Sequence, residues 1–245
     1  FGPVIALNGV SFDIRPGECH CLLGDYGAGK STFIKTMSGV HKPTSGKIMF
    51  EGREMNFSSP RDAMEAGIAT VYQDLAMIPL MSVTRNFWMG REPIRSLGPL
   101  KMIDFDKANS VTMEEMRKMG INLRSPDQAV GTLSGGERQT VAIARAVYFG
   151  AKVLILDEPT SALGVRQTAN VLSTIDKVRK KGIGVVFITH NVRHALAVGD
   201  RFTVLNRGKT LGTAQRGQIT PEELQDLMAG GQEMVALEGS LGGTV

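Results

Sequence analysis

A glycine-rich run between an expected strand and an expected helix could bind phosphate groups. It fits the pattern G-x-x-x-x-G-K-[ST] and consists of Gly24, Asp25, Tyr26, Gly27, Ala28, Gly29, Lys30 and Ser31, with Thr32 next. Glycines let backbone N–H groups turn inward around phosphate oxygens, and the helix start adds its positive dipole end. Lys30 can then reach the β- and γ-phosphates, while the Ser31 hydroxyl can bind Mg²⁺. The pattern predicts a site for ATP and Mg²⁺.

A pair of acidic residues follows a fully apolar stretch at 153–156. If that stretch is a strand of a parallel sheet, Asp157 comes at its carboxyl end, where such sheets place their ligands. Asp157 can then hold the Mg²⁺ shell. Glu158 is suited to accept a proton from an attacking water. Together with the glycine-rich run, the pair indicates hydrolysis of the nucleotide rather than binding alone.

A second anion site is expected at the start of another helix. Ser134, Gly135 and Gly136 lie in the run LSGGE, where exposed backbone N–H groups can face an anion. One chain would then carry two phosphate-binding surfaces. This suggests that two copies share their nucleotides.

Short apolar strands and helices that alternate along the chain must position these residues. We expect strands at 19–23, 46–50, 68–72, 153–156, 184–189 and 201–205, with a hairpin after 206–208. We expect helices at 30–38, 63–66, 105–119, 133–150, 165–181, 192–198 and 222–228. Residues 4–14 alternate apolar and polar side chains, as a strand would. The alternation favours an α/β fold with a mostly parallel core sheet and an N-terminal antiparallel β region.

The chain reads as one domain over 1–245 with an inserted segment. We expect the core at 1–73 and 150–230, a mostly helical subdomain at 74–149 and a loose tail at 231–245. The inserted segment is rich in methionine, which fits docking to a membrane partner through 75–83 and Trp88. The alternative is that these side chains fill the core of the segment itself.

Composition narrows the possible partners. The net charge of +4 is spread along the chain, so we expect no nucleic acid. No apolar run reaches the roughly 18 residues of a membrane span, and no signal pattern opens the sequence. Any membrane function would therefore use a partner, without direct insertion. The sequence begins at Phe1 without a methionine, which leaves room for residues upstream.

Cys19 and Cys21 flank His20 in an expected strand. Both thiols would face the same side and could contact one metal ion, but no further ligands stand nearby at a suitable spacing. We therefore favour buried, unreactive thiols. His20, His41 and His194 match no motif and are expected to be structural or solvated.

The three motifs together resemble the nucleotide-binding subunit of ABC transporters over nearly the whole chain. The family signature LSGGQ stands here as LSGGE. The resemblance implies further roles: Gln73 would sense Mg²⁺ and water, and His190 would contact the γ-phosphate. Phe1 would stack on adenine, and residues 161–163 would begin the D-loop. Residues 24–32, 160–165 and 189–195 most resemble ATPases of bacterial importers for ribose, galactose and fructose.

The resemblance also implies partners and a location. Two copies, or a pseudo-dimer, would sandwich ATP head to tail and dock onto a membrane-spanning permease, at the cytoplasmic face of the cell membrane. Each nucleotide would lie between residues 24–32 of one copy and 134–136 of the other.

Two residues depart from the family pattern. Gly164 stands where the D-loop usually continues with aspartate, so communication across a dimer could differ. Tyr26 is bulky for a position where small polar residues are common, and it would either crowd the nucleotide or point into solvent.

Other classes of protein share part of this chemistry. A DNA-maintenance ATPase would place long coiled coils between the two phosphate-binding motifs, and this interval lacks sustained heptads. A translation ATPase would normally carry two such domains with a charged linker. A small-molecule kinase has no use for LSGGE. A module that binds nucleotide without turnover is disfavoured by intact Lys30, Asp157, Glu158 and His190.

Overall fold

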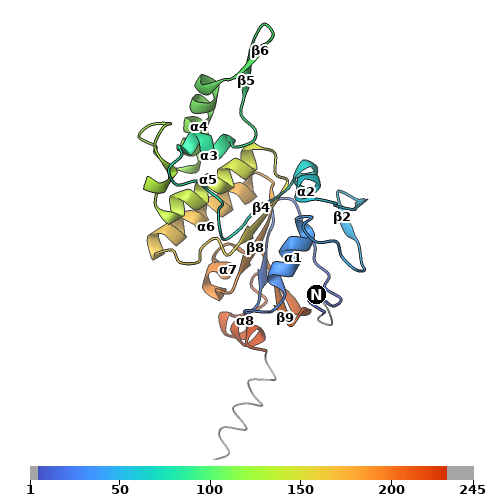
Figure 1. Cartoon of the computed structure of the whole chain (residues 1–245). Helices are drawn as coiled ribbons and strands as arrows, with labels where there is room; N and C mark the ends of the chain where they lie inside the picture. Colours follow the sequence, from blue (N-terminus) through green and yellow to red (C-terminus); the bar gives the residue numbers. More distant parts are fainter. Residues whose placement is uncertain (1–4, 231–245) are drawn as a thin grey trace, which may run out of the picture. The chain divides into compact units, whose positions relative to one another are not determined.

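The strand that leads into the glycine-rich run lies inside a six-stranded sheet (Figure 1). The computed structural model describes residues 5–230. The strand order is β10-β9-β1-β8-β7-β4. The strands are β1 (Cys19–Leu23), β4 (Ile68–Val71), β7 (Val153–Asp157), β8 (Gly184–Thr189), β9 (Arg201–Asn206) and β10 (Lys209–Gln215). β1 pairs in parallel with β8 and β9, β8 pairs in parallel with β7, and β10 runs antiparallel to β9.

Burial explains why the central strands are continuous apolar runs. Every residue of β1 and β8 is buried, as expected for parallel strands covered on both faces. Because β1, β8 and β7 are neighbouring parallel strands, their carboxyl ends meet at one edge of the sheet. The expected α/β fold with a mostly parallel sheet is confirmed.

Helices alternate with the strands of this sheet along the chain. They are α1 (Lys30–Met37), α2 (Pro60–Ala66), α6 (Val165–Lys180), α7 (Val192–Val198) and α8 (Pro221–Met228). Phe33 and Ile34 of α1 join a buried cluster with Leu22, Ile155 and Val186 of the sheet. Burying such side chains contributes about 1.5–3 kcal/mol each. This packing fixes the start of α1 against β1, where the glycine-rich run lies.

The N-terminal antiparallel region is present in a smaller form than expected. It consists of β2 (Ile48–Phe50) paired with β3 (Arg53–Met55). Residues 5–14 form no strand, so the expectation drawn from their alternating pattern is wrong for that stretch. Side chains of this stretch, such as Leu7 and Phe12, instead pack against the buried cluster.

The chain divides into two compact units. The first holds residues up to 70, 151–158 and those from 175 onward, and the second holds 71–150 and 159–174. Residues 159–174 thus belong to the second unit, whereas the sequence leads us to expect them in the core. Within residues 5–230 no helix has the length and apolarity to span a membrane.

The second unit contains helices and one hairpin. Its elements are α3 (Val83–Trp88), β5 (Ile94–Leu97), β6 (Leu100–Ile103), α4 (Phe105–Met119), a 3₁₀ turn η1 (Val130–Thr132), α5 (Gly135–Tyr148) and the part of α6 up to residue 174. The β5–β6 hairpin extends from α3 and α4 in Figure 1 and was not expected from the sequence.

Trp88 belongs to the core of the second unit. Its side chain is 5% exposed, and its indole N–H donates to the carbonyl of Ala108 and the hydroxyl of Thr112, both at 3.1 Å. Met116 and Met119 are buried as well. The prediction that Trp88 lines a docking groove is therefore wrong, because the ring fills the unit itself.

Candidate nucleotide site

The glycine-rich run forms a tight connection between β1 and α1. We call residues 24–32 the phosphate loop. A Cβ atom at Gly24 would lie 2.5 Å from the carbonyl oxygen of Leu205, so only glycine fits there. Gly29 caps α1 with a φ of 107°, a left-handed conformation that favours glycine. The loop therefore delivers the free N–H groups at the start of α1, as an anion site requires.

Lys30 lies across the phosphate loop. Its ammonium group donates to the carbonyl oxygens of Gly24 and Asp25, the latter at 3.0 Å. Burial lowers the pKa of Lys30, while the negative charges of Glu158, Asp25 and Asp157 oppose that shift. The cation is thus held where an incoming phosphate could replace the two carbonyl groups as its partner.

Asp157 is the last residue of β7 and Glu158 follows it, two strands away from β1, which leads into the phosphate loop. Burial raises the pKa of Asp157, and the charge of Glu158 raises it further, while Lys30 lowers it. A half-buried carboxylate beside a second one gains stability from a cation, which suits a Mg²⁺ ligand. Glu158 has a φ of 47° and its N–H donates to the carbonyl of Ile188 at 2.9 Å, which turns its side chain away from the strand direction.

Glu158 is held by two residues from the end of the neighbouring strand β8. Its Oε1 lies 2.8 Å from Nδ1 of His190, and its Oε2 accepts from the hydroxyl of Thr189 at 3.2 Å. Thr189 is fully buried and its Oγ1 accepts from the N–H of Asn191 at 3.1 Å, so the hydroxyl has a fixed orientation. The structure thus brings Glu158 and His190 together. Thr189 was missed by the sequence reasoning, and a hydroxyl residue closing an apolar strand was its only signal.

Tyr26 is an exposed residue of the phosphate loop. The residue is 88% exposed, and the centroid of its ring lies 5.9 Å from that of the His190 ring. The ring is open to solvent and lies near His190, so the expectation that it crowds the nucleotide stays a prediction.

The second anion surface is a well-formed helix start in the second unit. Ser134 caps α5, its hydroxyl accepting from the N–H of Glu137, and Glu137 in turn accepts from the N–H of Ser134 at 2.8 Å. Glutamate and glutamine can both accept at this position of a capping box, so LSGGE keeps the capping that LSGGQ would provide. A Cβ atom on Gly136 would lie 3.1 Å from Gln167, and one on Gly135 would lie 2.8 Å from Leu163. Close packing against these neighbours favours glycine at both positions.

For the remaining predicted site residues, the structure shows position and exposure. Gln73 is exposed and lies two residues beyond the end of β4. Ser31 and Asp25 are exposed, and Thr32 is half-buried in α1. Phe1 lies outside the described residues, so its adenine role stays a prediction, and so does the loose tail at 231–245.

The two cysteines are fully buried, and no group of three metal-binding side chains occurs in the described part of the chain. His20 is also buried, with Nδ1 2.6 Å from the carbonyl oxygen of Asp13 and Nε2 2.8 Å from the hydroxyl of Thr203. Its ring therefore has a structural role. The expectation of unreactive thiols fits this burial.

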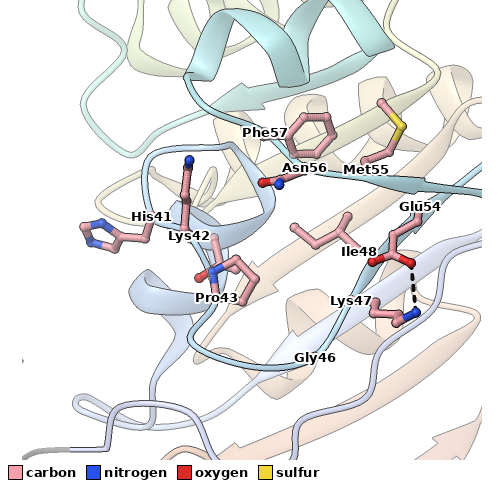
Figure 2. A pocket seen from close by; sticks show the side chains of 11 residues that line it. His41, Lys42, Pro43, Gly46, Lys47, Ile48, Glu54, Met55, Asn56 and Phe57 are labelled. Atoms are coloured by element: carbon pink, nitrogen blue, oxygen red, sulfur yellow. Dashed lines mark hydrogen bonds and ion pairs between the residues drawn. The ribbon is translucent and has the colours of Figure 1, made fainter.

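A pocket of about 270 Å³ lies in the first unit beside the β2–β3 pair (Figure 2). It is lined by Thr36 near the end of α1 and by Pro43, Lys47, Glu54 and Phe57 among others. Figure 2 shows Lys47 and Glu54 turned toward each other, and they form an ion pair at 2.9 Å. None of its lining residues belongs to the phosphate loop or to the 157–158 and 189–190 pairs, so it is distinct from the nucleotide site.

Known proteins resemble this chain in sequence and fold. Xylose/arabinose import ATP-binding protein XylG of Sulfolobus acidocaldarius is 45% identical over 234 residues, which cover 93% of this chain and 89% of that protein. Fructose import ATP-binding protein FrcA of Rhizobium meliloti is 41% identical over 238 residues, covering 95% and 91%. A solved dimeric ATP-binding cassette bound to ADP and Pi shares the fold, with a TM-score of 0.72 and 24% identity, covering 88% of this chain and 93% of that one.

A family model described as ABC transporter matches residues 7–161, which include the phosphate loop, the LSGGE run and the Asp157–Glu158 pair. The chain therefore belongs to the ABC transporter family, as one of its ATP-binding subunits.

Proposed function

We propose that this chain hydrolyses ATP to energise the import of a sugar through a membrane-spanning partner. The observation that carries the proposal is the meeting of Lys30, Glu158 and His190 at the carboxyl ends of β1, β7 and β8. This edge of a parallel sheet is where such folds bind ligands. The same edge supplies a cation, a base and a histidine, which are the groups that phosphoryl transfer to water needs.

In the proposed reaction the phosphate loop binds the triphosphate through its backbone N–H groups, and Lys30 balances the charge on the terminal phosphate. Glu158 accepts a proton from the attacking water at its carboxylate. Thr189 and His190 hold that carboxylate beforehand, with its two oxygens on separate partners. His190 would then turn from Glu158 toward the terminal phosphate as ATP enters.

The donors that the first unit offers for Mg²⁺ are the Ser31 hydroxyl and the Asp157 carboxylate, which are both hard oxygen ligands, and the role of Gln73 stays a prediction. The raised pKa of Asp157 fits a carboxylate built to face a cation. When bound there, Mg²⁺ neutralises phosphate charge and orients the terminal phosphate.

Two copies would share two nucleotides. The phosphate loop of one copy and residues 134–136 of the other each offer a helix start to the same triphosphate. A homodimer, or a pseudo-dimer with a related chain, would complete both sites. The solved dimeric cassette with ADP and Pi supports this arrangement by analogy of fold.

Sugar is the proposed cargo because the similar proteins named above import xylose, arabinose and fructose. The chain itself would contact the permease and not the sugar, at the cytoplasmic face of the membrane. The relatives give no support to a role in DNA maintenance or translation.

Sedimentation velocity of the Glu158→Gln chain tests the shared site. With the base removed, ATP should bind and remain intact, so a dimer should appear with ATP and disappear with ADP. The matched control is a Glu158→Gln chain that also carries Lys30→Ala, which should stay monomeric because it cannot hold the phosphates. A Glu158→Gln chain that is monomeric at saturating ATP would refute the shared site.

A further inference from the structure

The β5–β6 hairpin of the second unit exposes large apolar side chains. Figure 1 shows it extending beyond α3 and α4. All four residues of β6 are exposed, among them Leu100 at 66% and Met102 at 55%, and Ile94 of β5 is 56% exposed. A hairpin of only two strands is at best marginally stable in water when nothing packs on it. The exposed apolar side chains therefore indicate a surface that covers the hairpin.

Both faces of the hairpin carry apolar side chains. Residues opposite each other in an antiparallel pair lie on the same face. Ile94 is opposite Ile103 on one face. Arg95 is opposite Met102 on the other face, which Leu100 shares because it lies two residues from Met102. A folded protein surface would cover one face of such a hairpin, whereas a fluid lipid layer surrounds both.

The charged residues within the hairpin are both cations. Arg95 and Lys101 are exposed, and residues 94–103 contain no acidic side chain. The nearest carboxylates in the sequence, Glu92 and Asp104, lie at the base of the hairpin, where each accepts a hydrogen bond from a backbone N–H. Arg95 and Lys101 lie on opposite faces, so each face presents one cation beside its apolar side chains. A surface that combines negative charge with apolar material fits both faces.

The turn and the length of the hairpin set the depth that it can reach. Gly98 has a φ of 63°, and Pro99 after it has no N–H, so the turn offers one unpaired donor fewer. The outer edges of a two-stranded sheet still carry unpaired backbone groups, which are costly in hydrocarbon. With four residues in each strand, the hairpin reaches the headgroup level and is too short to cross the bilayer.

We propose that the β5–β6 hairpin rests on an anionic lipid surface, with its apolar side chains at the acyl boundary and Arg95 and Lys101 on lipid phosphates. The two cations attract the negative surface, and the apolar side chains leave water there. This contact goes beyond the proposed function, because it joins the chain to the lipid as well as to a membrane-spanning partner. It depends neither on ATP nor on the shared site.

Flotation of the full chain with lipid vesicles tests the contact. We expect the chain to float with vesicles of phosphatidylcholine mixed with phosphatidylglycerol, and to stay behind with phosphatidylcholine alone. Arg95→Gln together with Lys101→Gln should lower the partition coefficient by roughly fivefold per cation. Leu100→Ser together with Met102→Ser should lower it about tenfold, because less apolar surface then leaves water.

Met49→Ser together with Leu211→Ser is the matched control. These two side chains are 57% and 47% exposed on β2 and β10 of the first unit, so the same residue types are replaced at a distance in the sequence from the hairpin. The control chain should float as the wild type does. All substituted side chains are exposed, so circular dichroism should show the same fold in every variant.

A dye placed on the hairpin supplies the second readout. The native cysteines are fully buried, so a Leu100→Cys chain and a Met49→Cys chain each take one polarity-sensitive dye at the new thiol. With anionic vesicles, the emission of the dye at 100 should shift to the blue and be quenched by lipids with brominated acyl chains. The emission of the dye at 49 should stay unchanged.

The outcomes are distinct from those that test the proposed function. A wild-type chain that does not float with the anionic vesicles would overturn the lipid contact and leave a protein surface, such as that of the membrane-spanning partner, to cover the hairpin. Full binding by both double variants, or a dye at 100 that stays in water on bound chains, would also overturn it. None of these results bears on ATP hydrolysis or on the ATP-dependent dimer.

Discussion

The buried His20 ring gives a stability prediction whose sign and size follow from its surroundings. His20 is 1% exposed and stacks on Phe12 with ring centroids 4.0 Å apart. Nδ1 must donate to the carbonyl oxygen of Asp13, so Nε2 of the neutral ring accepts from the Thr203 hydroxyl. Since β1 carries His20 and leads into the phosphate loop, this ring helps to fasten the strand that positions Lys30.

Burial lowers the pKa of His20 below 6.5, and the charge of Arg201 lowers it further. The hydrogen bond to Asp13 and the charges of Glu18 and Asp13 oppose the shift. Below pH 6.5 the unfolded chain therefore binds more protons than the folded one, and stability falls as the pH falls. If the folded ring stays neutral, the free energy of unfolding drops by about 1.2 kcal/mol between about pH 7 and about pH 5.5.

Urea unfolding of the wild type and of a His20→Gln variant measures how much His20 contributes to the pH dependence of the free energy of unfolding. Glutamine keeps polar atoms near both partners and cannot take up the proton. The other titratable groups are the same in both chains, and Asp13, whose pKa is lowered, stays ionised over this pH interval, so their contributions cancel in the difference. The wild type should lose about 1.2 kcal/mol more than the variant over that pH interval. Equal losses in the two chains would refute the buried neutral ring.

Three further substitutions test the positions of single groups. Thr189→Val should lower kcat about tenfold in an ATPase assay with little change in KM, because Glu158 loses one hydrogen bond that orients it. An unchanged kcat would contradict this role of Thr189. Trp88→Phe should lower the free energy of unfolding in urea by about 0.5–1.5 kcal/mol, since the indole N–H no longer donates to Ala108 and Thr112 while the Ala108 carbonyl keeps the Thr112 hydroxyl as a donor; a neutral result would show that the indole N–H is dispensable. Gly24→Ala should abolish ATP binding in calorimetry, because the new methyl group would lie 2.5 Å from the Leu205 carbonyl oxygen; normal affinity would show that the phosphate loop adapts.

Elements with strong apolar periodicity and clear ends were predictable from the sequence. The helix at Phe105–Met119, the strand at Gly184–Thr189 and the helix at Val192–Val198 have the expected bounds. The β5–β6 hairpin was not foreseen, because Pro93 and Pro99 break that segment and its apolar side chains do not alternate regularly. Such a hairpin depends on pairing that local pattern does not encode.

The candidate site was predictable in its residues and less so in its contacts. Lys30, Asp157 and Glu158 were identified because each follows an apolar strand in a known motif. The contact between Glu158 and His190 depends on β7 and β8 being neighbours, which the order of strands in the sheet decides. Thr189 was missed for the same reason, because its role depends on Glu158, which follows the neighbouring strand.

Steady-state ATP hydrolysis by the purified chain, with and without Mg²⁺ and beside Glu158→Gln, tests the central claim most directly. The account predicts Mg²⁺-dependent turnover that falls by about 10²–10⁴-fold in the variant, because a general base contributes that much. Turnover at the wild-type rate in Glu158→Gln, or hydrolysis that does not depend on Mg²⁺, would contradict the proposed assignment of the base and the metal.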